Sequence, residues 1–262
     1  MSRPSVIDYV RGHHLLDDKV VVVTAAAGAG IGSAAAKRCL EEGARVVISD
    51  WHERRLGETL DKLAAEHGAN VAATPCDVTD EDQVQALLDT AVRTFGRLDV
   101  MINNAGLGGT KSVLEMTDDE WSRVLDVTLN GTFRCTRAAL KRLVEQGDGG
   151  AVVNNASVVG WRSQAGQAHY AAAKAAVMAL TRCAAADVAP HGIRVNAVAP
   201  SLAMHPFLAK VTDEQLLAEL TGREAFGRAA QPWEVANAMV FLASDYASYL
   251  TGEVLSVSSQ HP

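Results

Sequence analysis

The stretch Val20-Val-Val-Val-Thr24-Ala-Ala-Ala-Gly28-Ala-Gly30-Ile-Gly32 decides the fold, because a β-branched run passes directly into a glycine-rich turn and then an Ala-rich segment. Glycines at such a strand-to-helix turn let backbone N–H groups approach a pyrophosphate at the positive end of the helix. Asp50 closes the next β-branched run, at about the 20-residue distance expected of a dinucleotide-binding unit. We therefore predict a βαβ unit that binds a dinucleotide.

The alternation of strand and helix patterns continues along the chain. Apolar β-branched runs occupy 20–24, 45–49, 71–74, 98–102, 152–154, 193–198 and 254–257, and helical spacing occupies 31–42, 53–67, 80–95, 118–145, 168–189 and 232–244. Strands that are apolar throughout suit a parallel sheet covered on both faces. The sequence therefore predicts an α/β protein: a single-domain, doubly wound Rossmann fold whose seven-stranded parallel sheet has helices on both faces.

Nothing in the sequence suggests a division into two domains, since it has no internal repeat and no Pro/Gly-rich linker. We predict one Rossmann-type domain over 17–262, preceded by a loosely attached N-terminal extension of residues 1–16. Residues 200–226 break the alternation with a Pro-bounded loop, a short helix and another loop. They follow the carboxyl end of a strand, where open α/β sheets bind ligands, so we predict a substrate lid. A surface excursion without function is the alternative.

Composition excludes several classes of protein. The net charge of −7 disfavours binding to nucleic acid or to an anionic membrane. No apolar run reaches the roughly 18 residues needed to span a bilayer, and the first residues lack a secretory signal, so we expect a cytoplasmic protein. No metal site is expected, because the four cysteines lie far apart without metal-ligand spacing: Cys39, Cys76, Cys135 and Cys183.

A series of motifs at the predicted strand ends resembles the short-chain dehydrogenase/reductase family, from about Lys19 to Val257. After the glycine-rich turn these are Cys76-Asp77-Val78, Asn103-Asn104-Ala105-Gly106, Ser157, Tyr170-Ala-Ala-Ala-Lys174 and Ile193-Arg-Val-Asn196-Ala-Val-Ala-Pro200. One Y-x-x-x-K motif occurs by chance in many chains, but the whole series in register with the strand ends does not.

The resemblance implies a nicotinamide cofactor. The residues expected to hold it are Thr24, Ala26, Gly28, Gly30, Ile31, Gly32, Asp50, Asp77, Val78, Asn104, Ala105, Gly106, Pro200, Ala203 and His205. Asp77 would bond the adenine and Val78 would flank it, and the Pro200 loop would lie against the nicotinamide. An aspartate at position 50 accepts hydrogen bonds from the ribose hydroxyls and repels a 2′-phosphate, which favours NAD. Arg54 and Arg55 are near enough to soften this preference, so NADP remains possible.

Tyr170, Lys174 and Ser157 are the predicted proton-transfer residues. A phenol has a pKa near 10 and is a poor base at neutral pH. Lys174 stands four residues later on the same helical face, and an ammonium within a few ångströms lowers the pKa of a phenol. Ser157 follows a strand thirteen residues before Tyr170 and would bind the substrate oxygen. We expect an NAD(H)-dependent enzyme that interconverts a secondary alcohol and a ketone, with Tyr170 as acid and base.

The sequence departs from the family pattern in the phosphate turn and in the fourth catalytic residue. The turn is one residue longer than usual and Ala25 replaces its first glycine, which predicts a bulge. Counting seven residues from Trp121, where the family has its catalytic asparagine, gives Thr128. A backbone carbonyl there would still hold a water in a proton relay, so Thr128 is the fourth catalytic candidate. Asn130 lies about 200° around the helix and is expected to be structural.

Two further departures concern the nicotinamide loop and the C-terminus. His205 stands where a threonine usually binds the carboxamide; it would take over this role, touch the substrate or be a plain surface residue. The ending Ser256-Val-Ser-Ser-Gln260 replaces V-D-G-G, a segment that often helps subunit contacts. The expected homotetramer rests on the family resemblance alone.

The substrate side of the cleft is predicted from bulky side chains at Leu107, Trp161, Met204 and Phe207, with room left by Gly108 and Gly109. These residues favour a bulky alicyclic or acyl substrate. The combined motifs resemble bacterial dehydrogenases of steroid ring breakdown, which implies a bicyclic coenzyme A thioester. One alternative is a 3-oxoacyl-thioester reductase acting on acyl carrier protein or CoA, which would prefer NADPH. The other is a non-catalytic cofactor-sensing protein, which would not need a base.

Overall fold

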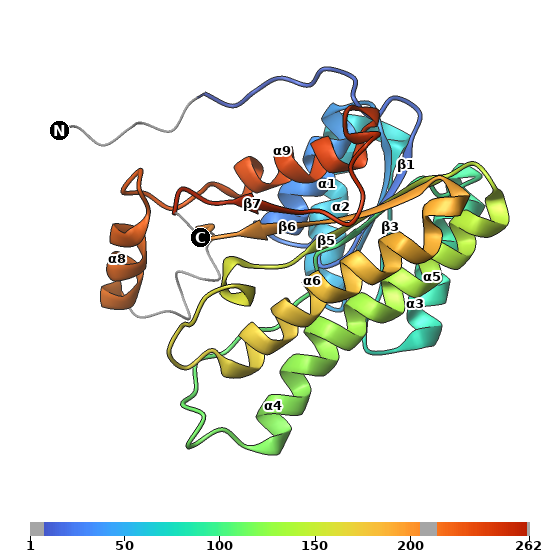
Figure 1. Ribbon diagram of the computed structural model, residues 1–262. Helices are drawn as coiled ribbons and strands as arrows, with labels where there is room; N and C mark the ends of the chain where they lie inside the picture. Colours follow the sequence, from blue (N-terminus) through green and yellow to red (C-terminus); the bar gives the residue numbers. More distant parts are fainter. Residues whose placement is uncertain (1–7, 205–213, 261–262) are drawn as a thin grey trace.

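The computed structural model describes residues 8–204 and 214–260, which form one layered α/β unit (Figure 1). Seven parallel strands make a single sheet in the order β3-β2-β1-β4-β5-β6-β7. Their bounds are β1 Val20–Val23, β2 Arg45–Asp50, β3 Val71–Pro75, β4 Val100–Asn103, β5 Gly150–Asn155, β6 Ile193–Pro200 and β7 Val254–Val257. The strand order reverses between β1 and β4, and the predicted seven-stranded sheet is confirmed.

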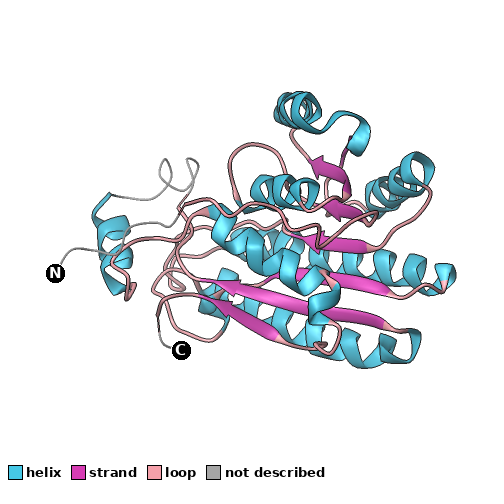
Figure 2. Ribbon diagram, turned by 90° about the horizontal axis from the view of Figure 1, so that it is seen from above, coloured by secondary structure: helices cyan, strands magenta, loops and turns pink. Residues whose placement is uncertain are grey.

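Helices cover both faces of the sheet (Figure 2). The helices are α1 Ile31–Glu41, α2 Glu53–His67, α3 Glu81–Phe95, α4 Asp118–Leu125, α5 Gly131–Gln146, α6 Ala168–Val188, α8 Glu214–Arg223 and α9 Pro232–Ala243. Short 3-10 turns lie at η1 Gly68–Asn70, η3 Val158–Gly160, η4 Ala189–His191 and η5 Asp245–Ala247, and a π-helical turn lies at η2 Asp126–Asn130.

Each central strand contributes to two apolar cores. In β1, Val21 and Val23 pack with α1, α2 and α9, whereas Val20 and Val22 pack with α3, α5 and α6. Because successive side chains of a strand point to opposite faces, a strand buried on both sides is apolar at every position. This arrangement explains why the runs that identify the strands show no polar alternation.

The sequence predicts one helix over 118–145, but the structure divides it at the π-helical turn Asp126–Asn130. Two close approaches lie at this point. The Thr128 side chain bonds the backbone of Leu107, and a Cβ atom at Gly131 would come 2.5 Å from Val78. Such tertiary contacts, which helical periodicity does not encode, favour a wider turn.

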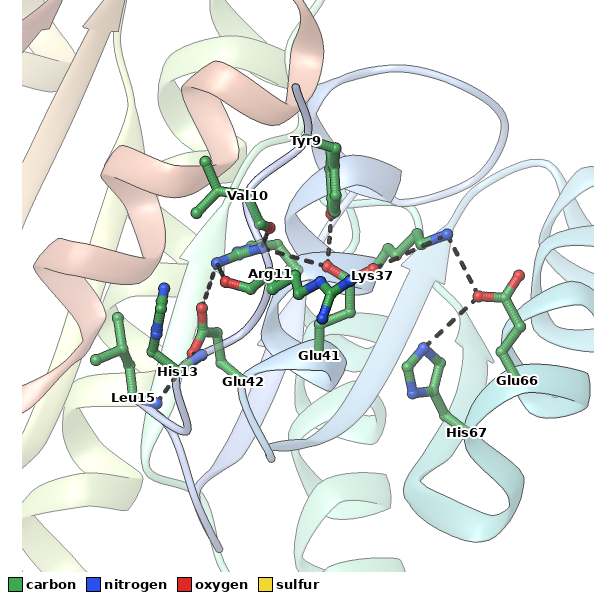
Figure 3. A network of polar contacts seen from close by, with 11 residues as sticks. Tyr9, Val10, Arg11, His13, Leu15, Lys37, Glu41, Glu42, Glu66 and His67 are labelled. Carbon is green, nitrogen blue, oxygen red and sulfur yellow. Dashed lines mark hydrogen bonds and ion pairs between the residues drawn. The ribbon is translucent and has the colours of Figure 1, made fainter. Parts of the chain in front are cut away.

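The N-terminal segment is attached more closely than the sequence suggests (Figure 3). The Glu42 carboxylate is fully buried and accepts hydrogen bonds from the backbone N–H groups of His13, at 2.7 Å, and Leu15, at 3.0 Å. Arg38 donates to the same carboxylate, and the Tyr9 ring meets Trp233 of α9 edge to face. Burial alone raises the pKa of Glu42, but these hydrogen bonds outweigh it and the net pKa is lowered.

Two searches of the described residues bear on other functions. None of the described helices combines the length and the apolar character needed to cross a membrane. No group of three or more His, Cys, Asp or Glu side chains within 8–204 and 214–260 is placed to hold a metal ion. Three of the four free cysteines are buried, at Cys39, Cys76 and Cys135.

Candidate active site

The glycine-rich turn after β1 has an unusual backbone at Ala25. Its φ is +50°, in the left-handed region that glycine adopts more readily, so the alanine has taken a glycine-like conformation. The next residue, Ala26, is buried beneath the turn, and its N–H donates to the Ser49 carbonyl at 2.8 Å. The Thr24 hydroxyl accepts from the Asn104 N–H at 2.9 Å. Thr24 and Ala26 therefore fix the turn to the sheet.

The glycines of the same turn leave room for a pyrophosphate. No atom lies within 4 Å of a Cβ built on Gly28 or Gly30, whereas a Cβ on Gly32 would collide with the Ala25 carbonyl oxygen. Helix α1 begins at Ile31 without a side-chain cap, which leaves its first N–H groups free of a capping side chain. A glycine cradle at the positive end of a helix suits a dinucleotide phosphate, so the residues present fit the expected cofactor.

Asp50 ends β2 beside this cradle and is 6% exposed. One carboxylate oxygen accepts from the His52 N–H at 2.9 Å and the other from the Ala27 N–H at 3.3 Å. Each oxygen keeps a further lone pair, so both remain able to accept from ribose hydroxyls. Arg55 Nη2 lies 3.8 Å from Oδ1 and forms an ion pair with this carboxylate.

Two other predicted cofactor residues, Asp77 and Val78, follow β3, and they differ in how far their side chains are exposed to solvent. Asp77 is exposed. Its carboxylate accepts two hydrogen bonds from Thr79, one from the Thr79 N–H at 2.9 Å and one from the Thr79 hydroxyl at 2.8 Å. Val78 is buried against Gly131 of α5.

Beyond β6, the structure describes both ends of the predicted lid, residues 200–204 and 214–226. Pro200 ends the strand, and Ala203 forms a parallel bridge with Ala230. His205 and Phe207 lie outside the described residues. The described part of the lid therefore consists of this bridge, α8 and the chain that leads into α9.

The three predicted proton-transfer residues lie together. Ser157 precedes the 3-10 turn after β5, and its hydroxyl accepts from the Val159 N–H at 3.4 Å and lies close enough to the Tyr170 side chain to lower the pKa of the phenol. Tyr170 and Lys174 lie one turn apart on α6, and Lys174 Nζ is 5.5 Å from the centre of the Tyr170 ring. Lys174 is 2% exposed, and its Nζ donates to the backbone carbonyl of Asn155.

Burial sets the charge states of this group in the ligand-free protein. Removal from water raises the pKa of Tyr170 to about 12, and the nearby Ser157 hydroxyl offsets only part of the rise. Burial also lowers the pKa of Lys174 to about 8. The lowered phenol pKa expected from the sequence is therefore not seen here, because desolvation dominates. At neutral pH, Tyr170 carries its proton and is set up as a donor.

Thr128 lies in the π-helical turn and is fully buried. Its hydroxyl accepts from the Leu107 N–H at 2.9 Å and donates to the Leu107 carbonyl at 3.0 Å. A Cβ on Gly106 would lie 3.8 Å from Thr128 and 3.5 Å from Lys174 Nζ, so the threonine lies close to the lysine. Asn130 is exposed and bonds Asp126 at 3.2 Å, away from this cluster.

The predicted substrate residues differ in how far they are buried. A Cβ on Gly108 would lie 3.8 Å from the edge of the Tyr170 ring, so the glycine backbone passes beside the ring without placing a side chain against it. Trp161 is 44% exposed and Met204 is half-buried. Thr128 holds the backbone of Leu107, and the Met204 N–H donates to the Ala230 carbonyl at 2.9 Å.

Sequence reasoning missed one residue that touches this group. Asn155 ends β5, and its carbonyl is the acceptor for Lys174. No motif marks it. The one available signal is the pair Asn154-Asn155 at the end of an otherwise apolar strand, because amides at a sheet's carboxyl edge need partners.

Comparisons with known proteins agree with this geometry. A family model described as enoyl-(acyl carrier protein) reductase matches residues 25–259. A protein of Mycobacterium tuberculosis, named (5R,7aS)-5-hydroxy-7a-methyl-1-oxo-2,3,5,6,7,7a-hexahydro-1H-indene-carboxyl-CoA reductase, is 62% identical over 97% of this chain and 97% of its own length. A cis-4-hydroxycyclohexanecarboxylate dehydrogenase of Sinomonas cyclohexanicum is 43% identical over 92% of this chain and 95% of its own.

A solved structure is similar over nearly the whole length. The crystal structure of a short chain dehydrogenase from Mycobacterium smegmatis has a TM-score of 0.88 and 55% identity, and it covers 98% of this chain and 99% of its own. The family model, these relatives and the assembled Ser157, Tyr170 and Lys174 lead to one conclusion: the chain belongs to the short-chain dehydrogenase/reductase family.

Proposed function

We propose that this enzyme interconverts a secondary alcohol and a ketone on a bulky, bicyclic, steroid-derived coenzyme A thioester, with NAD(H) as cofactor. The observation that carries the proposal is the 62% identity, over 97% of the chain, with a reductase named for a hydroxy-oxo-hexahydroindene-carboxyl-CoA. That name describes two fused rings, a hydroxyl, a ketone and a thioester. The absence of a side chain at Gly108, beside the Tyr170 ring, and the exposed Trp161 support a substrate of this size.

The side chains of the site have complementary tasks in the reduction. Ser157 binds the carbonyl oxygen, and Tyr170 donates its proton to that oxygen as the carbonyl carbon is reduced. With a pKa of about 12 in the free protein, Tyr170 holds this proton at neutral pH. Lys174, when protonated, stabilises the phenolate that remains. The bound nicotinamide dinucleotide supplies the hydride, and oxidation of the alcohol is the reverse reaction.

Asp50 supports the choice of NAD. Its buried carboxylate would repel a 2′-phosphate while its free lone pairs accept from ribose hydroxyls. The 3-oxoacyl-thioester reductase remains the alternative enzyme, and the expected NADPH preference of such an enzyme is unfavourable beside this carboxylate. A cofactor-sensing protein has no need for the Ser157, Tyr170 and Lys174 cluster.

A direct assay tests the proposal. NADH and NADPH are each titrated, and turnover is followed by nicotinamide absorbance with hydroxy-oxo-hexahydroindene-carboxyl-CoA and with 3-oxoacyl thioesters of CoA and acyl carrier protein. We expect NADH-linked turnover of the bicyclic thioester. NADPH-linked turnover of the 3-oxoacyl thioesters alone would favour the alternative enzyme, and NADH binding without turnover would favour the sensor. The cytoplasmic location and the homotetramer remain predictions, and light scattering tests the assembly.

A further inference from the structure

Strands β4 and β5 both lead into a pair of asparagines at the carboxyl edge of the sheet. Asn103 of β4 lies opposite Asn154 of β5 in the register, and Asn104 and Asn155 follow them. Because side chains alternate along a strand, the first pair and the second pair lie on opposite faces of the sheet. The edge therefore carries two asparagine layers, one above each core.

Within the described chain, the side-chain hydrogen bonds of Asn103 and Asn154 join the two asparagines to each other and to the helices behind them. Asn103 Nδ2 donates to Asn154 Oδ1 at 2.8 Å and to Thr136 of α5 at 2.9 Å. Asn154 Nδ2 donates to Thr181 of α6 at 3.0 Å. Both asparagines are buried, so this layer holds α5 and α6 to the sheet.

The layer formed by Asn104 and Asn155 joins the two functional parts of the site. Asn104 Nδ2 donates to the carbonyls of Thr24 at 3.2 Å and Ala25 at 3.1 Å, in the dinucleotide-binding turn. This fixes Asn104 Oδ1 as an acceptor, and Asn155 Nδ2 donates to it at 2.9 Å. The Asn155 carbonyl in turn accepts from Lys174 Nζ. A continuous path of hydrogen bonds therefore runs from the glycine turn to the proton-transfer lysine.

We propose that Asn155 is a positioning residue that couples dinucleotide binding to the placement of Lys174. This inference rests on the proposed function of Lys174 in proton transfer. The Asn155 side chain, anchored by Asn104, fixes the backbone carbonyl on which the buried lysine depends. Nζ donates to that carbonyl, so a shift of β5 at this residue moves the ammonium directly.

An unpaired amide oxygen does not distinguish the two layers, since Asn103 Oδ1 and Asn155 Oδ1 are both buried without a partner within the described chain. The distinction lies in what each layer connects. Loss of a bond in the first layer loosens two helices, whereas loss of a bond in the second separates the turn from the lysine. Burial keeps the pKa of Lys174 at about 8, close enough to working pH for small displacements to register in a pH profile.

The test compares Asn155→Leu with Thr181→Val. Asn155→Leu keeps the size of the side chain and the backbone carbonyl but removes the bond to Asn104, and Thr181→Val removes one buried bond from the other layer. Two readouts are used: the Kd of NADH from its fluorescence, and the pH at which ketone reduction declines. We expect Asn155→Leu to weaken NADH binding about tenfold, the equivalent of about 1.4 kcal/mol, and to move the decline in pH. Thr181→Val should lower thermal stability and leave both readouts unchanged.

The proposal would be overturned if Asn155→Leu had the same Kd for NADH and the same pH of decline as the parent protein. It would also be overturned if Thr181→Val changed both quantities as much as Asn155→Leu does. If Asn155→Leu does not fold, Asn155→Thr serves instead, because it keeps a strand-forming residue whose hydroxyl is too short to reach Asn104. The proposed substrate is tested separately. NADH binding needs no thioester, so a chain that binds NADH without reducing the bicyclic thioester contradicts the proposed function while leaving the binding half of this test readable.

Discussion

The two sides of the cleft differ in how firmly the protein holds them. On the cofactor side, Asp50 and Lys174 are almost fully buried. Asp50 accepts a hydrogen bond from Ala27 in the glycine-rich turn, and Lys174 donates one to Asn155 at the end of β5. On the substrate side, Trp161 is 44% exposed, and Gly108 places no side chain beside the Tyr170 ring. Groups that perform one unchanging reaction are fixed by the fold, whereas groups that select a substrate remain adjustable. Substitutions on the first side should therefore have larger effects on turnover.

The largest effect is expected from Tyr170→Phe. It removes the proton donor while keeping the ring, and a positioned acid contributes about 10²–10⁴-fold to a rate, so kcat should fall by about 10³-fold. Steady-state assays with the bicyclic thioester measure the loss, and the Kd of NADH is the control and should stay the same. Retention of more than a tenth of the activity would contradict Tyr170 as the donor.

A change of about 10²-fold in cofactor preference is expected from Asp50→Ala. The substitution removes charged hydrogen bonds to the ribose and the repulsion of a 2′-phosphate, and bonds to charged groups are worth about 1.5–3 kcal/mol each. Arg55, no longer beside a carboxylate, becomes available to the phosphate. The ratio of kcat/KM for NADH to that for NADPH measures the change. An unchanged ratio would mean that Asp50 does not face the ribose.

The pH profile should show a decline of about tenfold per pH unit in ketone reduction above the pKa of Lys174. That pKa is lowered to about 8 by burial. Below it the amine is charged and stabilises the phenolate; above it the charge is lost and the reduction slows. In Lys174→Arg the guanidinium stays charged, so its lower activity should remain level between pH 8 and pH 9. A decline shared by both proteins would exclude Lys174 as its source.

The smallest effect on chemistry is expected on the substrate side. Gly108→Val fills the space before Tyr170, so KM for the bicyclic thioester should rise about tenfold while a small secondary alcohol is affected less than threefold. Trp161→Ala, on the exposed rim, is the matched comparison and should change KM severalfold at most. Equal losses for large and small substrates in Gly108→Val would show a general distortion of the site and contradict a steric role.

The sequence predicts the sheet, its strands and the meeting of Ser157, Tyr170 and Lys174, because these depend on local patterns. Apolar strands are visible as runs, and residues at the carboxyl ends of parallel strands share one edge. The protonated state of Tyr170 was not predicted. It depends on how much water the surrounding segments exclude, and no motif records that quantity.

The π-helical turn at Thr128 and the role of Asn155 also lay beyond the sequence. Each depends on a hydrogen bond between segments distant in the chain: Leu107 with Thr128, and Asn104 with Asn155. Periodicity reports which face of an element is apolar, but it does not report which polar group on another element will meet it. The polar connections of the site therefore became visible only in three dimensions.

The hydrogen bonds that His13 and Leu15 donate to Glu42 bear on where the chain can be shortened. A protein begun at residue 17, just before β1, would leave this buried carboxylate with Arg38 alone and expose the apolar surface now covered by Leu16. A hydrogen bond to a charged group contributes about 1.5–3 kcal/mol, so the loss of these two N–H donors destabilises the fold even though the ion pair with Arg38 remains. The smallest independently stable form of this enzyme thus begins well ahead of its first strand, and trimming to the Rossmann boundary would yield a protein prone to unfold.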